Sequence, residues 1–104
     1  MLQQNIKDSE FECEIDKREL EDWETKLQDR KLQLKDLYKK QSGETPYKAW
    51  LYHKKANQLH QDIRKFRRKI KFWKGELEQD QIYLKEDRES LEEFLKEAEN
   101  LPLG

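Results

Sequence analysis

The residue types that most often carry chemistry are few in this chain, and their spacing argues against a reactive site. His53 and His60 lie seven residues apart, whereas metal-binding histidine pairs on helices lie four apart with a third ligand nearby. The lone cysteine, Cys13, falls on an apolar stripe, where a small buried residue is expected rather than a nucleophile. Asp80 and Asp87 suggest a paired acid, but polar residues in such a stripe more often set register or oligomeric state. We therefore predict no catalytic residues, no metal and no cofactor.

An apolar residue recurs at every seventh position over the second half of the chain, and a second series lies three residues further on. Such a sustained repeat is typical of a coiled-coil helix. The first series is Ala49, Ala56, Ile63, Ile70, Leu77, Leu84, Leu91 and Ala98, and the second is Tyr52, Leu59, Phe66, Trp73, Asp80, Asp87, Phe94 and Leu101.

The first half of the chain has a similar, less apolar stripe, and a short polar segment separates the two halves. We predict a first helix over about residues 4–41, a turn over 42–45 and a second helix over about 46–100. Gly43 suits the end of the first helix, and Thr45 followed by Pro46 suits the start of the second. The expected fold is all-α: a single coiled-coil hairpin domain, 1–104, of two long antiparallel helices, the second longer than the first. Residues Ile6, Cys13, Leu20, Leu27 and Leu34 form the strict part of the first stripe. Its companion positions are only partly apolar: Leu2, Ser9, Asp16, Trp23, Arg30 and Leu37.

The position of the turn predicts which residues face each other across the hairpin. A turn centred near residue 43 sets Leu37 opposite Ala49 and Leu27 opposite Leu59. The start of the first helix then lies opposite Leu84. The rest of the second helix extends beyond it and carries an unpaired apolar stripe. We interpret this stripe, with outward apolar residues near the same end, as a homodimer interface. Its residues are Leu91, Phe94, Ala98, Leu101, Phe11, Ile15 and Phe72.

Charge is strongly segregated along the chain. Residues 1–29 contain ten acidic and four basic side chains, residues 30–75 three and fifteen, and residues 76–104 ten and three. Basic runs of this density suggest contacts with an anionic partner such as a nucleic-acid backbone. We favour the alternative that acidic residues neutralise the run, residues 8–24 within the hairpin and residues 76–99 in a dimer. The candidate partner or anion contacts are Lys39, Lys40, Lys48, Trp50, Leu51, Lys54, Lys55, Arg64, Arg67, Arg68 and Lys71.

The composition suits a thin helical protein, since 43% of residues are charged and 34% hydrophobic. No apolar run approaches the roughly 20 residues of a membrane span, and a single cysteine suits a reducing compartment, so we expect a cytoplasmic location. The predicted function is a non-enzymatic protein–protein interaction module, an adaptor, scaffold or inhibitor, that self-associates and binds an unknown protein. The alternative is a nucleic-acid-associated protein that uses the basic segment 30–75.

Overall fold

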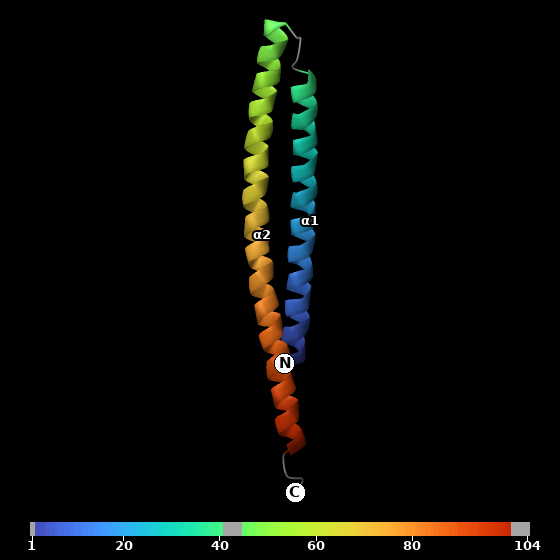
Figure 1. Ribbon diagram of the computed structural model, residues 1–104. Coiled ribbons are helices and arrows are strands. Elements are labelled where there is room, and N and C mark those ends of the chain that lie inside the picture. Colours follow the sequence, from blue (N-terminus) through green and yellow to red (C-terminus); the bar gives the residue numbers. More distant parts are fainter. Residues whose placement is uncertain (1, 41–44, 101–104) are drawn as a thin grey trace. The chain divides into compact units, whose positions relative to one another are not determined.

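Two long helices make up the described part of the chain. The computed structural model describes residues 2–40 and 45–100, with helix α1 over Leu2–Lys40 and helix α2 over Pro46–Asn100 (Figure 1). The predicted fold class, an all-α helical hairpin, is confirmed, and α2 is the longer helix. Helix α1 begins two residues before its predicted start, and residues 42–44 of the predicted turn lie outside the described residues.

Thr45 caps the second helix as predicted. Its Oγ1 accepts a hydrogen bond from the backbone N–H of Lys48 at 3.4 Å, and its carbonyl accepts one from the N–H of Ala49 at 2.9 Å. Pro46 follows as the first helical residue, a position where its missing N–H costs nothing. These contacts account for the start of α2 at the residue where the sequence places it.

The helices pack in two compact units. Among the described residues, the central unit contains 19–40 and 45–72, and the terminal unit contains 2–18 and 73–100. In the central unit, Tyr38 near the end of α1 contacts His60, whereas Trp23, earlier in α1, contacts Phe66, later in α2. The two helices therefore run antiparallel, as predicted.

The core of the central unit follows the predicted stripe. Two apolar clusters lie between the helices, and every buried residue in them is a predicted stripe residue. Arg30, also on the stripe, donates from Nε to Asp62 Oδ2 at 3.3 Å and lies over the ring of Phe66. The clusters are Leu27, Ile63, Phe66 and Ile70, and Leu37, Ala56 and Leu59.

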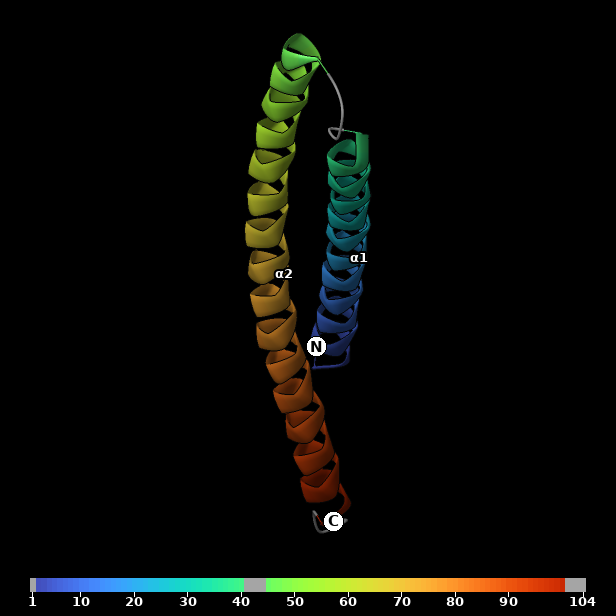
Figure 2. The same ribbon diagram turned by 45° about the horizontal axis from the view of Figure 1, so that its top comes forward.

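The predicted register is wrong by about one heptad. Leu37 packs against Ala56 and Leu59 instead of Ala49, and Leu27 lies in a different cluster from Leu59. Sliding one helix past the other by a full heptad keeps the apolar stripe intact, so the repeat alone does not fix the register. As a result, the first turns of α2 extend past the end of α1 (Figures 1 and 2).

The stripe of the terminal unit is more polar than that of the central unit. Ser9 Oγ donates a hydrogen bond to Asp87 Oδ2 at 3.0 Å. Cys13 and Asp16 are both buried, and the carboxyl group of Asp16 lies near that of Asp80. Polar stripe residues of one helix thus meet polar stripe residues of the other, which gives a physical reason for the observed register. In the predicted register, Ser9, Asp16 and Asp80 would each face an apolar side chain, and Asp87 would lie beyond the end of α1.

Candidate interaction surfaces

The C-terminal end of α2 presents an apolar stripe beyond the end of α1. The pairing of Ser9 with Asp87 and of Glu10 with Arg88 (3.1 Å) carries the helix contact further along α2 than predicted. Leu91 is consequently half-buried, and the uncovered stripe begins after it. We call residues 91–100 the acidic tail (Figure 2).

The acidic tail combines exposed apolar side chains with unpaired carboxylates. Phe94 is 59% exposed and Leu95 51%, and Ala98 is exposed as well. Lys96 reaches Glu92 at 3.8 Å, whereas the other acidic side chains of the tail have no ion-pair partner among the described residues. Leu101, predicted to belong to this surface, lies outside the described residues. The unpaired acids are Glu93, Glu97 and Glu99.

The other predicted self-association residues are also exposed. Phe11 and Ile15 lie one turn apart on the same side of α1, with exposed fractions of 63% and 40%. Phe72 is exposed on α2 in the central unit, within a groove of about 360 Å³ that Lys65, Arg68 and Lys69 complete. A common patch of Phe11, Ile15 and Phe72 stays a prediction.

The basic segment of α2 is not neutralised by direct ion pairs. Arg64, Arg67, Arg68 and Lys71 are exposed, and none has an ion-pair partner within 4.0 Å among the described residues. The acidic residues of α1 that do form ion pairs use other cations; Glu14, for example, binds Arg18 at 2.9 Å. Within the described residues, the acidic side chains 8–24 therefore make no direct ion pair with these four residues, which leave a basic surface on α2. Neutralisation by residues 76–99 in a dimer stays a prediction.

The tip of the hairpin, where α2 begins, carries an aromatic pair beside lysines. The rings of Tyr47 and Trp50 stack with centroids 6.4 Å apart, and Lys54 Nζ lies 4.8 Å from the Trp50 ring centroid. Leu51 is exposed nearby. Sequence reasoning overlooked Tyr47, although its position three residues before Trp50 places both on one helix side. The predicted tip lysines Lys39, Lys40, Lys48, Lys54 and Lys55 are all exposed.

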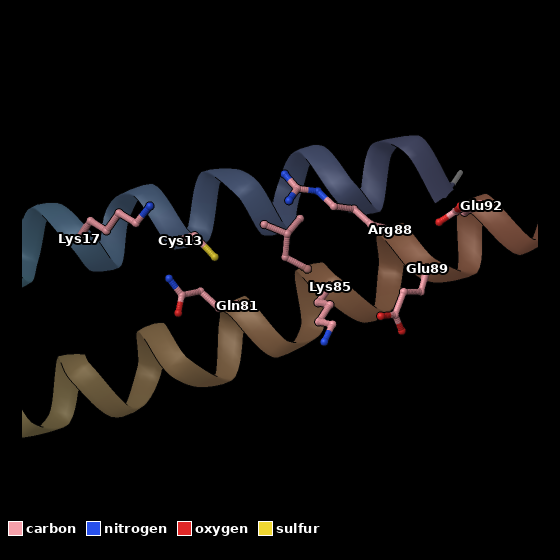
Figure 3. A pocket seen from close by; sticks show the side chains of 8 residues that line it. Cys13, Lys17, Gln81, Lys85, Arg88, Glu89 and Glu92 are labelled. Carbon is pink, nitrogen blue, oxygen red and sulfur yellow. The ribbon is translucent and has the colours of Figure 1, made fainter.

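A polar groove lies beside Cys13 in the terminal unit. It has a volume of about 430 Å³, and Lys17, Gln81 and Arg88 are among the residues that line it (Figure 3). Burial, and then the nearby carboxylates of Asp80 and Asp16, raise the pKa of the Cys13 thiol. A thiol in this setting stays protonated at neutral pH, which is the reverse of what a nucleophilic cysteine needs.

The histidines engage neighbouring side chains. His60 Nε2 lies 2.8 Å from the hydroxyl of Tyr38, and His53 Nε2 lies 3.4 Å from the amide nitrogen of Asn57. Within residues 2–40 and 45–100, no group of three or more metal-ligating side chains is placed to hold an ion. Over the same residues, neither helix is apolar enough over a sufficient length to cross a membrane.

Comparison with protein-family models, with curated protein sequences and with solved structures gave no match to this chain.

Proposed function

We propose that the chain is a non-enzymatic, self-associating protein–protein interaction module. The observation that carries this proposal is the acidic tail, a single helix whose apolar side chains Phe94 and Leu95 are more than half exposed. An exposed apolar stripe on a helix is typical of a docking surface for another helix. Such a module would act as an adaptor, a scaffold or an inhibitor, and its unpaired Cys13 suits the cytoplasm.

Solution mass tests this proposal. Light scattering over a range of concentrations should give a mass above the 12.9 kDa of a single chain, with a dimer as the smallest assembly. Replacing Phe94 and Leu95 by Glu should return the protein to 12.9 kDa while circular dichroism stays helical. Leu32→Glu is the matched control, since Leu32 is 66% exposed on α1, far along the sequence from the tail. A protein that is monomeric at every concentration would rule out self-association.

A second candidate function is binding to nucleic acid through the basic segment. The specific observation in its favour is that Arg64, Arg67, Arg68 and Lys71 are exposed without ion-pair partners among the described residues. Phosphate contacts depend steeply on salt, so retention on an oligonucleotide at about 50 mM salt should be lost by about 200 mM. Failure to bind at the lower concentration would reject this candidate.

A further inference from the structure

One side of α2 in the central unit carries only basic and aromatic groups over three turns. Five residues separated by one, three or four positions lie on this side of the helix: Arg64, Lys65, Arg68, Lys71 and Phe72. They point away from the buried stripe residues of the same segment, and all five are exposed. We call these five residues the basic face. Three of them, with Lys69, line the groove of about 360 Å³ beside Phe72.

The acidic tail has the complementary composition. At about 100° per residue, its four apolar side chains form one stripe, with Glu97 along one edge and Glu92 and Glu99 along the other. Of these acids only Glu92 has an ion-pair partner among the described residues, the exposed Lys96. The stripe consists of Leu91, Phe94, Leu95 and Ala98.

The lengths of the two surfaces agree. The acidic tail spans about 15 Å and the basic face about 13 Å, at about 1.5 Å per helical residue. Phe94 is a large exposed anchor on the tail, and the groove beside Phe72 offers an aromatic ring with cations around it.

Charge disfavours the symmetric alternatives. A tail-to-tail dimer would bring the glutamate edges of two copies together, and a face-to-face dimer would bring their arginines and lysines together. A tail placed on a basic face instead sets opposite charges along both edges of the apolar contact. Nucleic acid also suits the basic face, but it offers no counterpart to the exposed stripe of the tail, and phosphates would be repelled by the acidic segments of the same chain.

We propose that the acidic tail of one copy docks on the basic face of a second copy, with Phe94 entering the groove beside Phe72. This inference rests on the proposed self-association and names the two surfaces that perform it. Because the contact joins two different surfaces, each copy keeps one free tail or one free face, and association continues into longer assemblies or closed rings.

Two variants with one disabled surface each test the arrangement. The face variant replaces Arg64, Arg68 and Lys71 by Gln, and the tail variant replaces Phe94, Glu97 and Glu99 by Gln. Each variant alone should have the 12.9 kDa mass of a single chain in light scattering. An equimolar mixture should form a complex of two chains and stop there, because the intact tail of the face variant binds the intact face of the tail variant. Lys31→Gln with Lys35→Gln removes positive charge from α1 instead, and this control should leave wild-type assembly unchanged.

The outcomes separate this inference from the proposed function. A wild-type protein that associates, with face and tail variants that associate equally well, would overturn the inference and leave self-association standing. A wild-type protein that stays monomeric would overturn both. Monomeric wild-type protein that binds a single-stranded oligonucleotide, with binding lost in the face variant, would assign the basic face to nucleic acid instead. Circular dichroism of each variant checks that the helices are retained.

Discussion

The carboxyl group of Asp16 is buried between the helices of the terminal unit, beside that of Asp80. Burial is the main cause that raises the pKa of Asp16 to about 7, and the neighbouring Asp80 adds to it, followed by Glu76 and Glu12. The Oδ2 atom of Asp16 has no hydrogen-bond partner among the described residues. A carboxyl group with this pKa changes its charge near neutral pH, at a site where the two helices meet.

This carboxyl group should make stability decrease as the pH rises. Because the pKa of Asp16 in the folded protein lies above its ordinary value of 3.8, the folded state binds the proton more tightly. The contribution of Asp16 protonation to the stability of the fold is fully present below pH about 4 and is lost as the pH rises through about 7. Asp16→Asn should remove this dependence and raise the free energy of unfolding at pH 8 relative to wild type, by up to about 4 kcal/mol on the scale of about 1.4 kcal/mol per pKa unit.

Urea unfolding at pH 5 and pH 8 measures the difference between the two proteins. Asp22→Asn provides the control, since Asp22 is exposed on the same helix. An Asp16→Asn protein that loses as much stability between these two pH values as wild type would contradict the assignment.

Cys13 should react slowly with thiol reagents in the folded protein. It is 5% exposed, and its raised pKa keeps the thiolate fraction low. We expect alkylation by iodoacetamide at pH 8 to accelerate at least about tenfold in denaturant, where the thiol is accessible. Mass spectrometry follows the modification. Equal rates in the folded and unfolded protein would show that the terminal unit does not bury Cys13.

The observed register can be tested by cross-linking. In a Cys13→Ser background, cysteines at positions 37 and 56 should form an intrachain disulfide on oxidation, because Leu37 packs against Ala56. Cysteines at positions 37 and 49 represent the register expected from the turn alone and should remain reduced. Mobility on non-reducing gels reports the result. The opposite pattern would restore the register that the turn predicts.

Gly75 lowers the stability of α2, and replacing it by Ala should increase that stability. The position is helical, and a Cβ atom added there would have no neighbour within 4 Å. Gly75→Ala should therefore raise the free energy of unfolding by about 0.5–1 kcal/mol. Gln61→Ala, at the equivalent position two heptads earlier, should change it by a few tenths of a kcal/mol. A loss of stability in Gly75→Ala would indicate that another group occupies this space.

The sequence alone contained a further signal about register that the turn-based prediction did not use. Ser9 and Asp16 lie seven residues apart, as do Asp80 and Asp87. In an antiparallel pair, one alignment brings both polar positions of one helix opposite both of the other, and the structure has this alignment. Matching polar stripe positions would have selected it, because a polar side chain set against an apolar one loses solvation without a partner.

The sequence predicted some features of the candidate surfaces, and the structure was needed for others. Spacing alone predicted that Phe94, Phe72 and Arg64 lie off the buried contact or beyond it, and all three are exposed. It did not predict that Leu91 is half covered, because that depends on how far α1 extends along α2. Nor did charge counting reveal that Arg64, Arg67, Arg68 and Lys71 lack direct ion pairs among the described residues, since pairing depends on side-chain distances across the helices.

The sequence by itself determined the two helices, their cap and the stripe that packs between them, because these depend on local periodicity, propensity and capping within a few residues. Periodicity, propensity and capping did not determine the register, which depends on contacts between the helices, since sliding by one heptad leaves every local interaction unchanged and alters only which side chains meet. That choice places Asp16 beside Asp80, joins Arg30 to Asp62 and fixes how much of the acidic tail is left uncovered.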